Sequence, residues 1–215
     1  MTRSRVIRAA ALTSLALTLL VLGAALRPLV LPDNHTAPPI LDAVEIGFAQ
    51  DMTAHHQQAL MMVQRLDPGA GPAVQRLARQ LDDTQRLEMG TMLGWLRLAG
   101  APPTASRPMA WMHAKDAAVQ HHQVAASTPP ATMPGMATMA ELDALAAARG
   151  RDAEILFLQL MLRHHQGGIA MAMAADGLIA SGPVKETARS MVQGQNQEAG
   201  IIGLMLGQLG GQPLS

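Results

Sequence analysis

Apolar and small side chains recur at helical spacing in two segments that include the chain's only phenylalanines. In the first segment, successive steps of four, three, four and three residues connect Phe48, Met52, His55, Ala59 and Met62. Residues with this spacing share one face of an α-helix. The second segment repeats the pattern, at a constant offset of 109 residues, as Phe157, Met161, His164, Gly168 and Met171. The chain therefore contains an internal duplication of a helix.

The duplication continues downstream, where the offset becomes 110 residues. Ala78-Arg79, Gln85, Glu88 and Gly90 return as Ala188-Arg189, Gln195, Glu198 and Gly200. The repeating unit is therefore a helical hairpin, and turn residues separate its two helices at 67–69 and at 181–183. The pattern predicts helices over 40–66, 72–99, 152–175 and 183–209. A capping box of Thr138 and Glu141 opens a short helix that ends at Gly150.

These elements predict an all-α fold, a ferritin-like four-helix bundle built from two duplicated hairpins. The predicted layout is a signal peptide or membrane anchor at 1–30, a linker at 31–39, and a single domain over 40–215. Within this domain, the first hairpin covers 40–100 and the second 151–215. Between them, 101–150 form a Met/His-rich insert, irregular to about residue 137, with a short helix expected around 110–125.

The first 30 residues have the composition of an export signal. Arg3, Arg5 and Arg8 precede an uncharged apolar run from Ala9 to Leu26. This run is long for a cleaved signal and about long enough to span a bilayer, so the sequence slightly favours an uncleaved anchor with its basic end in the cytoplasm. We therefore expect an extracytoplasmic domain, either anchored or released.

Composition narrows the function classes. The chain has no cysteine, so an exported domain must be held together by packing, or by packing and metal. Aromatic residues make up 2% of the chain and no basic stripe is present, which excludes a nucleic-acid-binding protein. A homo-oligomer remains open.

Histidine and methionine are the residues with candidate chemistry. Thioethers are ligands for Cu(I), and imidazole binds copper, zinc, iron and nickel. Burying two His-His doublets on apolar helix faces costs desolvation free energy unless the imidazoles gain a binding partner. The predicted metal ligands are His55, His56, His164 and His165 with Met52, Met62, Met161 and Met171, and an auxiliary site in the insert at Met133 and Met136.

Other interpretations of these residues stay open at this point. Buried methionines mostly fill cores, as we expect for Met89, Met92, Met191 and Met205. Gln57 or Gln166 could hydrogen-bond the histidines, and Asp51 could orient His55. We expect no carboxylates along the histidine face, which argues against a di-iron oxidase. His121 and His122, in the insert, are metal ligands or simply exposed.

These motifs resemble the family known as domain of unknown function 305. The matching parts are Phe48 to His56, Gln85 to Glu88, Met133 to Met136 and Phe157 to Met171, over about residues 40–210. The resemblance implies an exported, ferritin-like helical bundle, and some relatives are linked to copper or silver binding and tolerance. The insert is longer than the family pattern, with an extra Met/His-rich stretch at 109–122.

The leading hypothesis is a Cu(I)- or Ag(I)-binding bundle that acts as a buffer or chaperone and not as an enzyme. Another transition metal is a second candidate for the ion. Because imidazole must be neutral to bind metal, affinity at the histidines should weaken below about pH 6. The alternatives are a structural or protein-interaction module without metal and, more weakly, a metal-dependent redox enzyme.

Overall fold

The structure is a computed structural model that describes residues 3–30, 39–113 and 132–214. The chain divides into two compact units, Met1–Pro39 and Ile40–Ser215. Most of the predicted linker and most of the short helix expected around 110–125, including His121 and His122, lie outside the described residues.

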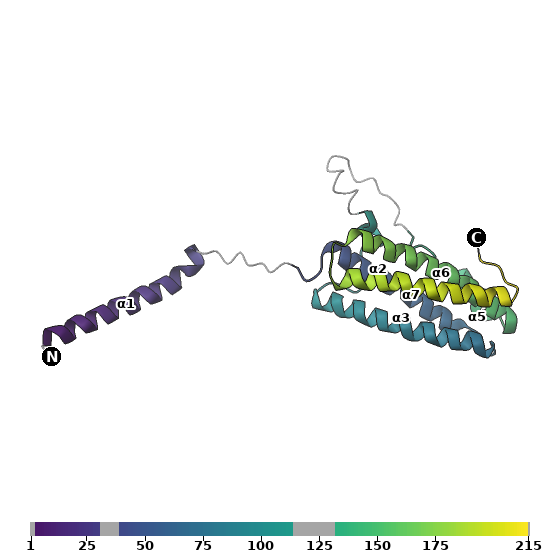
Figure 1. The fold of residues 1–215 in the computed structure, drawn as a ribbon, viewed down its shortest axis with the longest axis horizontal. Helices are drawn as coiled ribbons and strands as arrows, with labels where there is room; N and C mark the ends of the chain where they lie inside the picture. The colour runs from purple at the N-terminus through teal and green to yellow at the C-terminus, as the bar shows by residue number, and fades with distance from the viewer. Residues whose placement is uncertain (1–2, 31–38, 114–131, 215) are drawn as a thin grey trace, which may run out of the picture. The chain divides into compact units, whose positions relative to one another are not determined.

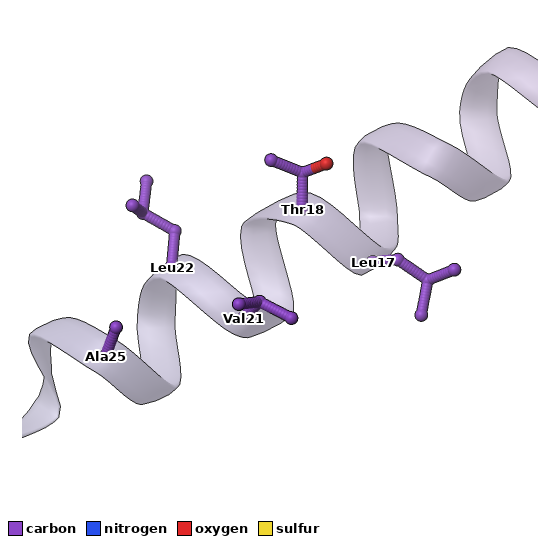
Figure 2. A pocket seen from close by; sticks show the side chains of 5 residues that line it. All are labelled: Leu17, Thr18, Val21, Leu22 and Ala25. Atoms are coloured by element: carbon purple, nitrogen blue, oxygen red, sulfur yellow. The ribbon is translucent and has the colours of Figure 1, made fainter.

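The first unit contains one long helix, α1 (Arg3–Val30). Its segment Ile7–Leu26 has a mean hydropathy of 2.2 and none of it is buried. Apolar side chains such as Leu17, Val21 and Leu22 project from the helix in different directions (Figure 2). A helix that is apolar all round has the length and composition to cross a membrane, and an N-terminal signal sequence has the same properties.

Four long helices form the bundle of the second unit (Figure 1). They are α2 (Ala43–Arg65), α3 (Pro72–Leu98), α6 (Gly150–Leu178) and α7 (Pro183–Gln208). α2 packs against α3, α6 against α7, and α2 against α6. A short helix, α5 (Met139–Ala147), and a 3₁₀ turn, η1 (Ala110–His113), lie against α2 and α6. The described residues contain no strand, so the all-α prediction is confirmed, and the arrangement agrees with a ferritin-like bundle.

Local sequence signals fix the helix starts. Asp42 caps α2 in a capping box with Glu45, and Thr138 caps α5 in the predicted box with Glu141. α3 and α7 each begin with a proline, which is suited to the first helical turn because it lacks the N–H that would otherwise be unpaired there.

The apolar core consists of two clusters, and each draws on both hairpins. The Phe48 cluster comprises the N-terminal half of α2, the C-terminal half of α6 and the adjoining parts of α3 and α7, including Phe48, Met52, Met92, Met171 and Met191. The Phe157 cluster comprises the complementary halves, including Met62, Leu81, Phe157, Met161 and Ile202. Equivalent positions of the two repeats therefore belong to different clusters. Phe48 lies in one cluster and its counterpart Phe157 in the other. On both α2 and α6, the histidine doublet lies between the residues of one cluster and those of the other.

The segment after α3 is held on α2 by a buried carboxylate. Asp51 accepts hydrogen bonds from the Met109 N–H (2.6 Å) and from Trp111 Nε1 (2.9 Å). The Trp111 ring meets Phe48 edge-on, with centroids 5.6 Å apart. Burial raises the pKa of Asp51, while the two donors act in the opposite direction. Asp51 therefore anchors this segment, and the prediction that it orients His55 is wrong.

A second segment, Met133–Ala137, crosses α2 and α6, and we call it the strap. The side chain of Gln58 donates to the Ala137 carbonyl (2.8 Å) and accepts from the Ala137 N–H (2.6 Å). On α6, a Cβ at Gly167 would collide with the carbonyl oxygen of Pro134. Gly135, at φ +76°, approaches the backbone of α6 equally closely, so this contact is backbone on backbone.

We predict that Gly167→Ala destabilises the protein by about 1–3 kcal/mol, because the added methyl has no space against a backbone carbonyl. Gly207→Ala on α7 is the matched control, since a Cβ there meets nothing within 4 Å. The control should be neutral or stabilising by up to about 1 kcal/mol, as expected for Gly→Ala in a helix. Urea denaturation of both variants measures the difference, and equal midpoints would contradict the close strap contact.

Candidate metal centre

The two histidine doublets meet inside the bundle. His55, His56, His164 and His165 are each no more than 1% exposed. The rings of His55 and His164 lie nearly stacked, with centroids 3.8 Å apart and an interplanar angle of 31°. On each helix the neighbouring histidine ring lies farther out, 6.4 Å from the inner one. The sequence prediction that the doublets converge in one interior is confirmed.

Hydrogen bonds fix the tautomers of the inner histidines. His164 Nε2 lies 2.9 Å from the His55 carbonyl oxygen, and His55 Nε2 lies 3.0 Å from the Pro134 carbonyl oxygen on the strap. A carbonyl only accepts, so each Nε2 carries the proton and each Nδ1 keeps a bare lone pair. Neither Nδ1 has a hydrogen-bond partner among the described residues.

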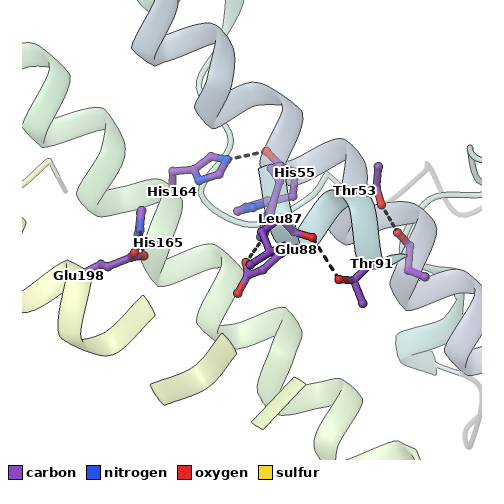
Figure 3. A network of polar contacts seen from close by, with 10 residues as sticks. Thr53, His55, Leu87, Glu88, Thr91, His164, His165 and Glu198 are labelled. Carbon is purple, nitrogen blue, oxygen red and sulfur yellow. Dashed lines mark hydrogen bonds and ion pairs between the residues drawn. The ribbon is translucent and has the colours of Figure 1, made fainter. Parts of the chain in front are cut away.

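Each outer histidine is paired with a glutamate from the second helix of its own hairpin. Figure 3 shows the pair of His165 with Glu198. His56 Nε2 lies 2.5 Å from Glu88 Oε2, and His165 Nε2 lies 3.0 Å from Glu198 Oε2. Glu88 and Glu198 are duplicated positions, so the same pair is built twice. The sequence predicts no carboxylates along the histidine stripes themselves; these two come from α3 and α7, and neither belongs to the Glu-x-x-His pattern of di-iron proteins.

The remaining ring nitrogens differ between the two halves. His165 Nδ1 donates to the Met161 carbonyl oxygen at 2.9 Å. In contrast, His56 Nδ1 has no partner within the described part of the chain. Three imidazole nitrogens, on His55, His56 and His164, are therefore buried without a hydrogen bond from the described residues.

Two glutamines of the duplicated hairpins complete this polar layer. Gln85 and Gln195 are buried, and each has one side-chain atom without a hydrogen-bond partner among the described residues. Gln195 packs directly on Gly168, where a Cβ would meet its side chain. Gln57 and Gln166, the predicted partners of the histidines, are exposed, so that prediction is wrong.

The methionines lie at two distances from the histidines. Met52 and Met161 each precede the inner histidine of their helix by three residues, about one turn. Met62 and Met171 follow it by seven residues, or about 10 Å along the helix axis. All four are fully buried. Met133 and Met136 on the strap are half-buried, and Met133 packs against the Phe48 cluster.

The methionines expected to fill the core do so to different extents. Met92 and Met191 are fully buried, as predicted. Met89 and Met205 are half-buried, and Met205 packs against the Phe157 cluster.

Burial keeps the inner histidines neutral. Desolvation, with the nearby imidazole of His56, lowers the pKa of His55 to about 3. Desolvation also lowers the pKa of His164 well below its usual value, and His55 adds to this effect. The expectation that metal affinity weakens below about pH 6 assumed ordinary imidazoles. The lowered pKa values of these two rings move their competition with protons to more acidic pH, so we now expect any weakening of metal affinity there well below pH 6.

The acidic and imidazole groups do not by themselves make a conventional metal site. Among the described residues, no three histidine, aspartate or glutamate side chains lie close enough together to hold a metal ion. A metal ion at the histidine pair would therefore need a further ligand of another kind, and methionine sulfur is the donor that lies within one helical turn.

These features define a class: an all-helical bundle with a duplicated histidine–glutamate centre in its interior, preceded by an apolar N-terminal helix. Residues 45–206 match the family model described as "Domain of unknown function (DUF305)". The chain belongs to this family, as its motifs indicate. No curated protein matches the chain.

Three solved structures are similar to the bundle. A DUF305 protein from Streptomyces coelicolor, described as a candidate secreted protein, is 35% identical with a TM-score of 0.69, covering 80% of this chain and 96% of that one. A DUF305 fragment from Deinococcus radiodurans is 31% identical with a TM-score of 0.63, covering 80% and 99%. CopM in its Cu(II)-bound form is 20% identical with a TM-score of 0.54, covering 76% and 96%, and shares the fold.

Two observations bear on where the bundle is located: the description of the Streptomyces relative as a candidate secreted protein, and the apolar N-terminal helix of this chain. The helix has the properties of a signal peptide or an anchor. Both observations support an extracytoplasmic location of the bundle.

We predict that the stability of the metal-free protein falls as the pH drops from about 6.5 towards 3. The unfolded histidines bind protons near pH 6.5, whereas folded His55 and His164 stay neutral, so the unfolded state takes up more protons across this interval. Each such proton costs about 1.4 kcal/mol of stability per pH unit. Urea midpoints at pH 7.5, 6 and 4.5 measure the loss.

The double variant His55→Gln/His164→Gln is the control for this pH dependence. Glutamine keeps an N–H donor for the two carbonyls but does not titrate. Its stability should fall less steeply with acid than that of the wild type. Parallel curves would mean that other groups carry the pH dependence.

Proposed function

We propose that this protein captures a soft monovalent metal ion, Cu(I) or Ag(I), outside the cytoplasm and holds it in the histidine layer as a buffer or chaperone. The observation that carries the proposal is the pair of bare Nδ1 lone pairs on His55 and His164, beside an Nδ1 of His56 that also has no hydrogen-bond partner among the described residues. A buried polar atom without a partner costs about 1–3 kcal/mol, and a bound cation removes this cost. The arrangement therefore favours a ligand that accepts imidazole lone pairs.

The proposed ion is soft because of the donors around it. Thiolates are absent, and no three histidine, aspartate or glutamate side chains converge in the described residues, whereas thioethers lie one helical turn away. Thioether and neutral imidazole suit Cu(I), and neither has to lose a proton to bind it. The copper-bound form of CopM, a protein with the same fold, adds weight to copper.

The proposed ligands are the inner histidines with Met52 and Met161, which precede them by one turn. His56 is the next candidate, and Glu88 would orient it. His165 belonged to the predicted set, but both of its ring nitrogens already contact oxygen atoms of Met161 and Glu198, which favours a structural role. Met133 and Met136 form the auxiliary site on the strap. Met62 and Met171 belonged to the predicted set, but their distance along the helix favours a packing role.

We also propose the arrangement of the chain around this function. Residues 40–215 act as one metal-binding domain, with hairpins over 40–100 and 151–215 and the insert between them. If α1 is retained, it keeps the domain at the membrane surface where metal crosses. If it is removed, the same domain is released.

Titration of the purified domain with Cu(I) against a chromogenic chelator, without oxygen, tests the function. The wild type should compete with the chelator at micromolar metal. His55→Gln/His164→Gln should lose affinity by more than about tenfold, because outer-shell changes alone typically cost 10- to 100-fold. Absence of competition by the wild type, or unchanged affinity of the variant, would remove the support for metal capture.

The methionines provide a matched pair of variants. Met52→Leu/Met161→Leu removes the two sulfurs nearest the histidines, and Met62→Leu/Met171→Leu removes two equally buried sulfurs two turns away. Both exchanges conserve volume and should cost less than about 1.5 kcal/mol at each site. We expect the first variant to lose Cu(I) affinity by about tenfold or more and the second to retain it. If the two double variants bind Cu(I) with equal affinity, Met52 and Met161 are not ligands.

The rival proposal is a structural or interaction module with a hydrogen-bonded histidine core. It is favoured by the carbonyl and carboxylate partners of the histidine rings. It predicts that Cu(I) does not raise the melting temperature of the wild type. Metal capture predicts a rise that depends on metal concentration and is absent in His55→Gln/His164→Gln.

A further inference from the structure

The histidine pair is closed off from solvent in this structure. The four rings are at most 1% exposed, so an ion reaches their lone pairs only if a covering segment moves. The described partners of these rings lie on α2 and α6 through the carbonyls of His55 and Met161, on α3 and α7 through Glu88 and Glu198, and on the strap through Pro134. Four long helices packed through two apolar clusters are costly to separate. The strap is the one non-helical partner among these contacts.

The strap is held by hydrogen bonds to α2, by close backbone contacts with α6, and by apolar packing of Met133 and Ala137 against the core clusters. Three hydrogen bonds join it to α2: His55 Nε2 to Pro134, and the two bonds between Gln58 and Ala137. The residues that follow are fixed firmly, because the capping box and an ion pair of Glu141 with Arg163 (2.7 Å) hold the start of α5 on α6. Movement of the strap would therefore leave α5 and the four long helices in place.

Lifting the strap acts directly on the metal site. The bond from His55 to Pro134 breaks, which releases the one inner ring that is not held by another helix. His164 is not released in this way, since its Nε2 is bonded to the His55 carbonyl within the bundle. The strap also carries two half-buried thioethers, Met133 and Met136, on either side of Pro134-Gly135.

We propose that the strap is the gate through which a soft monovalent ion reaches and leaves the histidine pair, with Met133 and Met136 as its transient ligands. This inference rests on the proposed function and assigns its access route. Thioethers suit this step because they bind Cu(I) without releasing a proton. The ion passes from the strap methionines to His55 when the strap opens, and is enclosed when the strap returns.

Gln58→Ala tests the gate, with Gln50→Ala as its matched control. Both glutamines lie on α2 and are 7% exposed, but Gln50 donates to Pro102, away from the strap. Release of Cu(I) to excess chelator, followed by stopped flow, should be about tenfold faster or more in Gln58→Ala, since two hydrogen bonds of the closed state are lost. Gln50→Ala should release at the wild-type rate.

The methionine role is tested by uptake rates. Met133→Leu/Met136→Leu should slow Cu(I) uptake with a smaller effect on equilibrium affinity, and Met173→Leu, at a 59% exposed methionine of α6, should change neither. Loss of affinity without a change in rate would make the strap methionines permanent ligands and overturn their transient role.

Amide hydrogen exchange of the metal-free wild type tests the gate without any variant. The Ala137 N–H, bonded to Gln58, should exchange faster than amides in the middle of α2, because the strap opens locally. Equal protection, or equal release rates of the two glutamine variants, overturns the gate and leaves metal capture intact. A wild type that binds no Cu(I) removes both proposals.

Discussion

The burial of two stacked, neutral imidazoles at the centre of an apolar bundle is the constraint around which this molecule is arranged. Water would satisfy all four of their ring nitrogens, and the folded interior satisfies only two, through carbonyls of α2 and the strap. The apolar clusters on both sides provide the stability that tolerates this cost. These unpaired lone pairs at the centre of a layer that is built twice are the basis of the proposed ligand site.

Duplication explains most of the layer, and the departures from symmetry show where its two halves differ. Each hairpin contributes an inner histidine, an outer histidine with its glutamate, and a buried glutamine. At the strap this equivalence ends, because the counterpart of Gln58 is Gly167, which leaves space for the Pro134 carbonyl. His55 therefore bonds to a removable segment, whereas His164 bonds to a helix. One half of the layer is fixed and the other can open.

The stripe of Phe48, Met52 and His55 predicted the helices and the meeting of the doublets, because a single period determines both which face is buried and which residues share it. Glu88 and Glu198 were missed although they recur at the expected offset, since pairing across two helices depends on their rotation about each other. The bonds of Pro134 and Ala137 to α2 span 79 residues and depend on how an irregular segment folds back. No local sequence pattern encodes how such a segment folds back. The hydrogen bond between Asp51 and Trp111 could not be predicted for the same reason.

The closed layer also bears on how the protein would use metal. An ion held by buried neutral donors dissociates only as fast as the cover opens, so the residence time is set by the strap and not by ligand strength alone. Strong hydrogen bonds from Gln58 to the strap favour long-term metal storage. Weaker bonds favour a chaperone that transfers its ion to a partner. The same ligands can therefore serve either role, and the segment that encloses them decides between the two. In this proposal the choice depends on Gln58, which is not among the proposed ligands.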